Sequence, residues 1–234
     1  MSRCRCPLRS LLLPLVSLAL APAPALALSF QNGVDGYLGA DNKSYSFDGT
    51  IEHDVIRVDR PLTGEAGSYA WVVFADLVGP GAIPPGATIA QAVLEGWVTN
   101  PFGSATVTLL LDDIANRPVS PNRIDDAGVA GSFYDDTLDV SATHPGCADS
   151  SLCDPPVLVT WDVTDLVQAL ADGAPNFGFL ILPDTTNGGN LAGTDDATVS
   201  LRPRLVVTLA PEPGTIALTG LALAALVAFR SRTR

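Results

Sequence analysis

Short runs in which apolar and polar residues alternate, separated by Gly and Pro clusters, fill the middle of this 234-residue chain. Successive side chains of a β-strand point to opposite faces of a sheet, so a period of two predicts strands with one buried face. Turn clusters such as Gly79-Pro80-Gly81 separate the runs. The predicted strands are residues 51–59, 69–77, 88–99, 105–111, 157–163, 177–182 and 199–209.

One segment has the spacing of a short helix rather than a strand. Its predicted cap, apolar side and end are Asp162 or Thr164, then Leu166, Val167 and Leu170, then Gly173. Charged residues make up only 16% of the chain, which argues against a coiled coil or a charge-rich disordered segment. Together these features predict an all-β fold: a mostly antiparallel β-sandwich with one short helix.

The first 27 residues have the organisation of a cleavable secretory signal peptide. A start that carries three arginines precedes an apolar stretch at residues 11–20, and Ala25-Leu26-Ala27 has the small-x-small pattern of a cleavage site. We therefore expect cleavage between Ala27 and Leu28. The folded domain then spans residues 28–209, which is enough chain for one domain with a sizeable core.

The last residues, 210–234, have the organisation of a sorting tail. Pro211-Glu212-Pro213 precedes a hydrophobic helix predicted at 215–229 and an end with three arginines. This order resembles the PEP-CTERM sorting signal of Gram-negative bacteria. The resemblance implies that an exosortase-type enzyme processes the protein near Pro-Glu-Pro and passes it to the cell envelope or the exopolysaccharide matrix.

The apolar part of this tail is short for a membrane span. Residues 216–229 would rise about 21 Å as a helix, against a hydrocarbon core of about 30 Å. Snorkelling arginines would extend its reach, and the positive-inside rule places the basic end in the cytoplasm. We expect transient anchoring in the inner membrane with the domain outside; an ordinary C-terminal membrane anchor is the alternative.

The predicted domain is strongly acidic. The whole chain has a net charge of −12, and setting aside the six arginines of the two ends and Glu212 leaves −17 for the middle. Such a domain repels phosphate backbones, so we expect no nucleic-acid partner. The charge suits a soluble extracellular domain, a cation-binding surface or a surface for neutral glycans.

Four segments of the middle form an ordered set: residues 30–37 (FQNGVDGY), 83–98 (IPPGATI to AVLEGWV), 163–179 (VTDLVQA to NFGF) and 202–208 (RPRLVVT). In order and spacing they resemble the DNRLRE domain family, which is related to carbohydrate-binding module family 96. The resemblance implies a jelly-roll type of sandwich over residues 28–209. Members of the family occur in secreted enzymes, adhesins and matrix proteins, and some bind polysaccharides.

The chain departs from this family in two respects. We expect the domain to stand alone, without an attached catalytic domain. The stretch from residue 116 to 156 is longer and less regular than the family's central loop, as expected for a local insertion.

Two cysteines, Cys147 and Cys153, remain once a signal carrying Cys4 and Cys6 is removed. Outside the cytoplasm such a pair predicts a disulfide that closes a short loop. With the nearby His144 the pair supplies three ligands, fewer than a structural zinc site needs.

The sequence lacks the residue patterns of known catalytic sites. It has two histidines, His53 and His144, and no nucleophile elbow, zinc-protease motif or phosphate-binding loop. Its four pairs of adjacent aspartates would point to opposite faces of a strand and make poor acid–base pairs. We therefore expect no enzyme. The alternative, a polysaccharide-acting enzyme, would need a cleft lined by Arg57, Arg123 or His144.

Aspartates near the two ends of the domain give a weak calcium signal. Asp35 and Asp41 could meet Asp195 or Asp196, because the first and last strands of a jelly roll are often neighbours. Calcium takes about six to eight oxygen ligands, which loop carboxylates and carbonyls supply. The chain has no EF-hand loop, so solvated turn aspartates are the alternative.

The aromatic residues do not identify a ligand site by sequence. Trp71, Trp97 and Trp161 all lie in alternating strand patterns, which predicts that they are buried in the core. The better candidates for exposure are Tyr37, Tyr45, Tyr69 and Tyr134.

From these features we expect an exported, non-catalytic protein of the cell envelope or biofilm matrix, either structural or carbohydrate-binding. Its expected partners are an exosortase-type enzyme, an extracellular polysaccharide and, transiently, the inner membrane. The alternatives are a polysaccharide-acting enzyme and an adhesive scaffold that binds protein partners.

Overall fold

The computed structural model describes residues 25–45, 51–52, 55–58, 69–110, 134–143, 147, 152–183 and 189–211. Ala25–Ala210 forms one compact unit. Residues 1–24 of the expected signal peptide and the expected sorting tail beyond Pro211 lie outside the described residues, as do His53, Arg123 and His144. No helix in the described part of the chain is long and apolar enough to cross a membrane.

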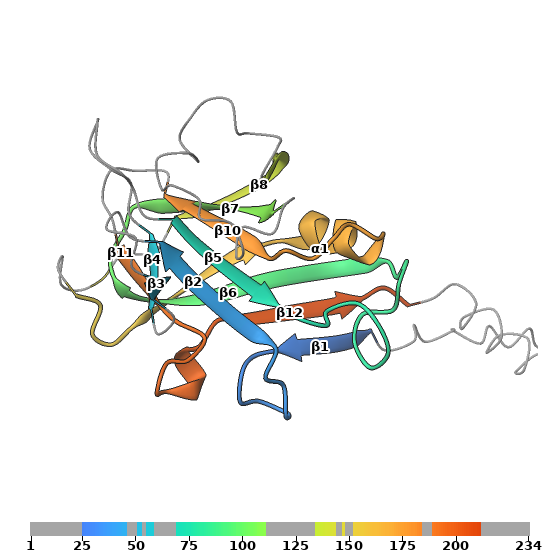
Figure 1. The fold of residues 1–234 in the computed structure, drawn as a ribbon, viewed down its shortest axis with the longest axis horizontal. Helices are drawn as coiled ribbons and strands as arrows, with labels where there is room; N and C mark the ends of the chain where they lie inside the picture. The colour runs from blue at the N-terminus through green and yellow to red at the C-terminus, as the bar shows by residue number, and fades with distance from the viewer. Residues whose placement is uncertain are drawn as a thin grey trace, which may run out of the picture. The chain divides into compact units, whose positions relative to one another are not determined.

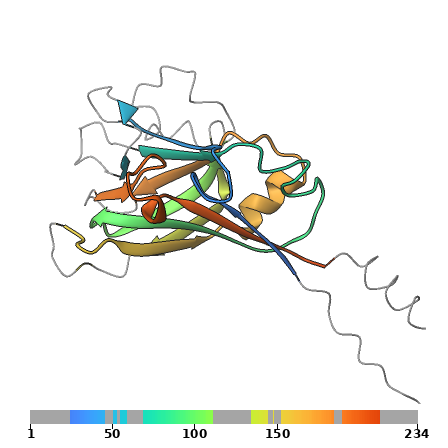
Figure 2. The same ribbon diagram turned by 90° about the horizontal axis from the view of Figure 1, so that it is seen from below.

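Two antiparallel sheets pack face to face, so the prediction of an antiparallel β-sandwich with one short helix is confirmed (Figures 1 and 2). In the described residues each sheet has six strands. The first sheet contains β1 (Leu26–Phe30), β12 (Arg204–Leu209), β6 (Ile89–Asn100), β11 (Gly189–Ala192), β4 (Val55–Val58) and β9 (Val157–Asp162). The second sheet runs β3 (Ile51–Glu52), β2 (Ala40–Tyr45), β5 (Tyr69–Phe74), β10 (Phe179–Pro183), β7 (Ser104–Leu110) and β8 (Tyr134–Thr143).

The central strand of the first sheet is β6, which has neighbours on both edges. Glu95 is in register with Arg204 of β12 on one edge and with Thr160 of β9 on the other. Further along, Leu191 of β11 is in register with Val98 on the β12 side. This twelve-residue strand therefore aligns three others, and its alternation decides which side chains enter the core.

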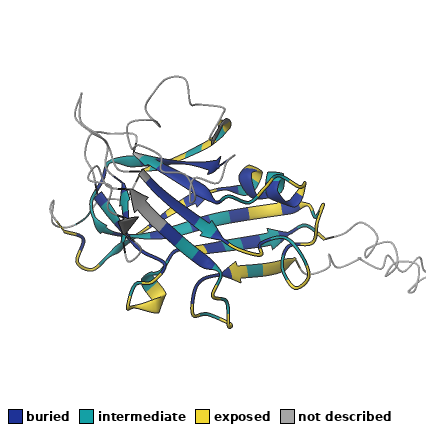
Figure 3. Cartoon of the chain, viewed as in Figure 1, coloured by how far each residue is buried: buried dark blue, intermediate teal, exposed yellow. Residues whose placement is uncertain are grey.

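The core lies between the two sheets and follows the alternation of β6. Ala92, Leu94, Gly96 and Val98 are buried, whereas the residues between them are partly exposed (Figure 3). From the second sheet, Phe74 and Phe179 meet edge to face with ring centroids 6.4 Å apart. Such contacts explain why the apolar runs of the sequence end up on facing surfaces.

The predicted helix is present as α1 (Thr164–Ala171) and buries its predicted apolar side. It ends at Ala171, two residues before Gly173, which has a φ of 106°, a backbone conformation that favours glycine. The expected cap differs slightly: the capping position is Val163, and the Asp162 carboxylate one residue earlier accepts the N–H of Thr164 at 3.2 Å. Thr164 Oγ1 instead accepts the N–H of Ala92 at 2.9 Å, which attaches the helix to β6.

The structure differs from the predicted strands in a few places. The stretch 199–209 is divided: Val199–Leu201 forms a 3₁₀ turn, and β12 begins only after Pro203, which has no N–H to donate to a ladder. Part of the stretch 116–156, predicted to be irregular, forms the long strand β8. In this strand Leu138, Val140 and Ala142 pack against the core and the residues between them are exposed, so its own alternation indicated a strand.

Candidate functional site

The predicted disulfide between Cys147 and Cys153 is confirmed, with 5.0 Å between the two Cα atoms. Cys153 is buried, and its N–H donates to the carbonyl oxygen of Thr99 at 3.0 Å. This hydrogen bond attaches the disulfide-closed segment that precedes β9 to the end of β6. This is a structural role, and the sulfur atoms are not available as ligands.

The four aspartates proposed as calcium ligands lie on separate elements. Asp35 is in an exposed turn, Asp41 is on β2, and Asp195 and Asp196 lie in the turn before the 3₁₀ segment. The Asp196 carboxylate accepts the N–H of Thr198 at 2.7 Å. Among the described residues, no three or more His, Cys, Asp or Glu side chains gather where they could hold a metal. The structure thus does not bring these aspartates together as a ligand set.

The two segments that carry these aspartates do meet, but through buried amides. Asn42 Oδ1 accepts the N–H and the hydroxyl of Thr194 at 2.6 and 2.7 Å, and Asn42 Nδ2 donates to the Val55 carbonyl at 3.2 Å. Asn32 Oδ1 accepts the N–H of Ala40 at 2.8 Å, and Asn32 Nδ2 donates to the Ala40 carbonyl at 2.6 Å. Buried amides with both ends bonded hold two strands in place and leave no group for a ligand.

A second set of contacts joins the same segments near the surface. Gln31 Nε2 donates to the carbonyls of Val199 and Arg202 at 3.1 and 2.8 Å. Arg202 Nε in turn donates to the Asp196 carbonyl at 2.7 Å. The segments 30–37 and 202–208, which carried part of the family resemblance, are therefore in contact, and their polar residues hold the first and last parts of the domain together.

Tyr37 has a structural role. Its hydroxyl donates to the Ala75 carbonyl at 2.8 Å, and its ring meets Phe30 edge to face at 5.5 Å. Burial and the negative charge of Asp76 raise the pKa of this hydroxyl above its ordinary value. The side chains of Tyr45, Tyr69 and Tyr134 lie outside the described residues.

The three tryptophans divide into two kinds. Trp71 and Trp161 are buried, as predicted, and each indole donates to a backbone carbonyl, to Phe177 and Ala105 respectively. Trp97 was also expected in the core, but it lies on the outer face of the first sheet and is partly exposed. The reason is parity: in β6 it alternates with the buried Gly96 and Val98 and shares a face with Glu95. That parity was readable in the sequence.

Residues of three strands share this outer face with Trp97. Trp97 is in register with Leu158 of β9, which is 37% exposed. Two residues earlier, Glu95 is in register with the exposed Thr160 of β9 and with Arg204 of β12. We call this surface, formed by Glu95, Trp97, Leu158, Thr160 and Arg204, the Trp97 face.

An ion pair occupies one side of the Trp97 face. Arg204 Nη2 lies 2.6 Å from Glu95 Oε2, and Arg204 Nε donates to the same oxygen at 2.7 Å. The Arg204 side chain is 44% exposed and that of Glu95 is 17% exposed. The two charges cancel locally, so this part of an acidic domain is electrically neutral while it keeps several polar groups at the surface.

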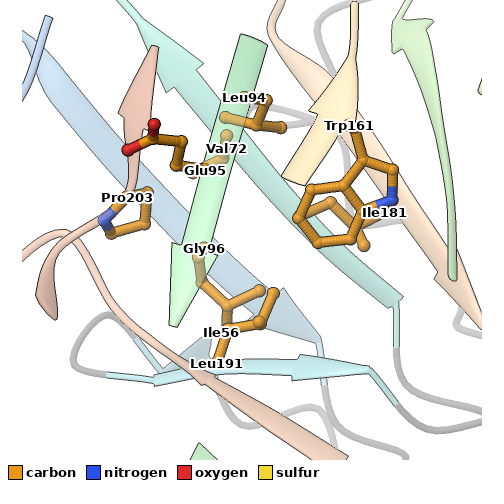
Figure 4. Close-up of a pocket in the computed structure, with 9 residues that line it drawn as sticks. All are labelled: Ile56, Val72, Leu94, Glu95, Gly96, Trp161, Ile181, Leu191 and Pro203. Atoms are coloured by element: carbon orange, nitrogen blue, oxygen red, sulfur yellow. The ribbon is translucent and has the colours of Figure 1, made fainter. Parts of the chain in front are cut away.

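A small cavity lies inside the sandwich beneath β6 (Figure 4). Its volume is about 10 Å³, and its lining includes Leu94, Trp161, Ile181 and Leu191. Gly96 also borders it, and a Cβ at that position would lie only 3.3 Å from Leu191 Cδ2. Ligand pockets measure roughly 300 Å³ or more, so this cavity is a packing gap of about the size of one water.

Of the residues expected to line an enzymatic cleft, the structure describes Arg57, which lies half-buried on β4.

Neither a scan of family models nor a search of the curated proteins gives a match for this chain.

Proposed function

We propose that this chain is an exported, non-catalytic protein of the cell envelope or exopolysaccharide matrix that binds a polysaccharide. In this proposal the sandwich is a jelly-roll domain of the DNRLRE type, delivered by its signal peptide and its PEP-CTERM tail. The signal-like and tail-like patterns of the two ends support export. The disulfide is consistent with it, because disulfides persist mainly in oxidising compartments.

The Trp97 face is the observation that supports binding. An indole on a sheet surface presents a broad apolar plane against which the apolar side of a sugar ring can stack. Glu95 and Arg204 lie on the same face, about 7 Å from Trp97 along the strand. A polysaccharide stacked on Trp97 would bring its hydroxyl groups within reach of both side chains. An open sheet suits an extended polymer better than a small molecule, which would need a pocket.

The negative charge of the domain disfavours acidic polysaccharides as ligands. With a net charge of −17 over the middle of the chain, the domain repels polyanionic glycans at long range. The ion pair on the Trp97 face cancels its own charge, so a neutral polysaccharide meets no electrostatic penalty there. We therefore expect neutral polysaccharides to bind more tightly than acidic ones.

The test is binding of the purified domain to a panel of neutral, acidic and basic polysaccharides, measured by calorimetry or by depletion from solution. Trp97→Ala should weaken binding at least about tenfold, or ~1.4 kcal/mol. Val206→Ala is the matched control, since Val206 lies on the same sheet face but on β12, outside the Trp97 face. Binding that survives Trp97→Ala unchanged would exclude this face, and no binding by any polysaccharide would leave only the structural role.

The alternative functions give different results in the same experiment. A polysaccharide-acting enzyme would release new reducing ends from a bound polymer over time. An adhesive scaffold would bind none of the polysaccharides and would instead retain protein partners.

A further inference from the structure

Four overlapping Ala-x-Ala tripeptides within residues 19–27 have the pattern that a signal peptidase recognises. Cleavage after Ala21 or Ala23 would have to break a bond to Pro22 or Pro24, so the last two tripeptides are the candidates. Ala23-Pro24-Ala25 and Ala25-Leu26-Ala27 both place small residues at the two required positions. The first would release a chain that begins at Leu26, and the second a chain that begins at Leu28. The sequence pattern alone does not distinguish them.

The first strand of the domain begins at the upstream site. β1 covers Leu26–Phe30 and pairs along its length with β12, beginning with Leu26 opposite Leu209 and Ala27 opposite Thr208 (Figure 1). It is an edge strand, with β12 as its one ladder neighbour in the described residues. Cleavage after Ala27 would remove two of its five residues, whereas cleavage after Ala25 would leave the strand whole.

The position of the new terminal charge also differs between the two sites. Cleavage creates an α-ammonium group on the first remaining residue. Leu26 is 57% exposed, so its ammonium would lie at the surface, in contact with water. Leu28 is partly buried and packs against the core, so a charge there would be partly desolvated and would weaken the ladder beside it.

The accessibility of the peptide bond to the signal peptidase also favours cleavage after Ala25. A peptidase needs its target in an extended form with free backbone groups. The partner strand β12 is at the end of the domain, so β1 pairs only after the rest has crossed the membrane. From that moment the Ala27–Leu28 bond lies inside a ladder, whereas Ala25 stays exposed and outside the strand.

We infer that the signal peptide is removed after Ala25 and that the mature protein begins at Leu26. This assignment rests on the proposed export of the chain. It makes the processing site coincide with the first residue of the fold, so that cleavage leaves β1 whole and places the new charge at its exposed first residue.

The test is the intact mass of the full chain after expression in a Gram-negative host with a secretory pathway. We expect a mature N-terminus at Leu26, heavier than a Leu28 start by one leucine and one alanine residue. Ala27→Glu should leave that terminus unchanged, because it disrupts only the downstream tripeptide. Ala23→Glu disrupts the upstream tripeptide and leaves Ala25-Leu26-Ala27 intact, so it should produce the Leu28 form or uncleaved precursor.

The outcomes separate the site from the export proposal. An exported wild-type protein that begins at Leu28 would overturn the assignment and leave export intact. A protein that stays in the cytoplasm and begins at Met1 would overturn both. As an independent check, a domain prepared from Leu28 should melt about 2–4 °C below one prepared from Leu26, and equal melting temperatures would contradict the role given to Leu26 and Ala27.

Discussion

The indole Nε1 of Trp161 donates a 2.9 Å hydrogen bond to the carbonyl oxygen of Ala105, across the core from the first sheet to the second. Trp161 is 1% exposed and lies beside Gly96, whose missing side chain makes room for the ring. The bond satisfies a buried carbonyl of β7 and fixes the distance between the sheets at this point.

We expect Trp161→Phe to lower the free energy of unfolding by about 1–3 kcal/mol, because the Ala105 carbonyl loses its partner and the smaller ring leaves a gap. Chemical denaturation measures this change. Trp97→Phe is the control, since Trp97 lies on the surface and should lose less than 1 kcal/mol, roughly the value for surface substitutions. Equal effects at the two positions would contradict the assigned roles.

Asn42→Ala removes the group that joins β2 to the segment at Thr194. The N–H and hydroxyl of Thr194 and the Val55 carbonyl would lose a partner in a buried setting, so we expect a loss of about 2–4 kcal/mol in stability. Asn42→Asp should also destabilise, and more strongly at neutral than at acidic pH, because burying its ionised form is unfavourable. A pH-independent effect of Asn42→Asp would argue against the burial of this side chain.

The raised pKa of Tyr37 predicts a loss of stability in alkaline solution. In the folded state burial and Asp76 favour the neutral phenol, whereas in the unfolded chain the pKa is about 10. The stabilisation is therefore complete below pH ~10 and declines as the pH rises above that value. Thermal unfolding from pH 7 to 11 should show a smaller alkaline decline in Tyr37→Phe than in the wild type. Parallel declines would contradict the assignment.

The disulfide should stabilise the domain by about 2 kcal/mol, because it closes a short loop between cysteines that are six positions apart in the sequence. Replacing Cys147 and Cys153 together by serine should lower the melting temperature by several degrees, and a reducing agent should have the same effect on the wild type but none on the variant. Polysaccharide binding should be unchanged at temperatures where both forms are folded, because neither cysteine belongs to the Trp97 face.

The ion pair of Glu95 and Arg204 should matter more for binding than for folding. Exposed pairs contribute roughly 1 kcal/mol or less to stability, so Glu95→Gln and Arg204→Gln should unfold close to the wild type. On the proposed function, each should weaken polysaccharide binding several-fold, because an uncharged amide makes weaker hydrogen bonds than the charged group it replaces. A reversed order, with large losses of stability and unchanged binding, would assign the pair to the fold alone.

Local patterns were sufficient for most strands and for the helix, but not for all elements. The alternation around Val157–Asp162 and the apolar spacing of Thr164–Ala171 correspond to observed elements. By contrast β2, whose residues are mostly polar, was not predicted, because Asn42 is buried only by virtue of its distant partners. The candidate site was not predicted: Trp97 was expected in the core, although the alternation of β6 places it on the outer face, and its neighbours on β9 and β12 depend on strand register.

Four properties follow from local sequence patterns: the all-β class, the helix, the pairing of Cys147 with Cys153 and the face of β6 on which each residue lies. These properties depend on neighbours along the chain, through the period of a strand or the closing of a short loop. The tertiary structure alone decided that Asn42 meets Thr194, 152 residues away, that Leu26 pairs with Leu209, and that Arg204 meets Glu95 beside Trp97. Those contacts depend on the order and register of strands in two packed sheets, which local periodicity does not encode.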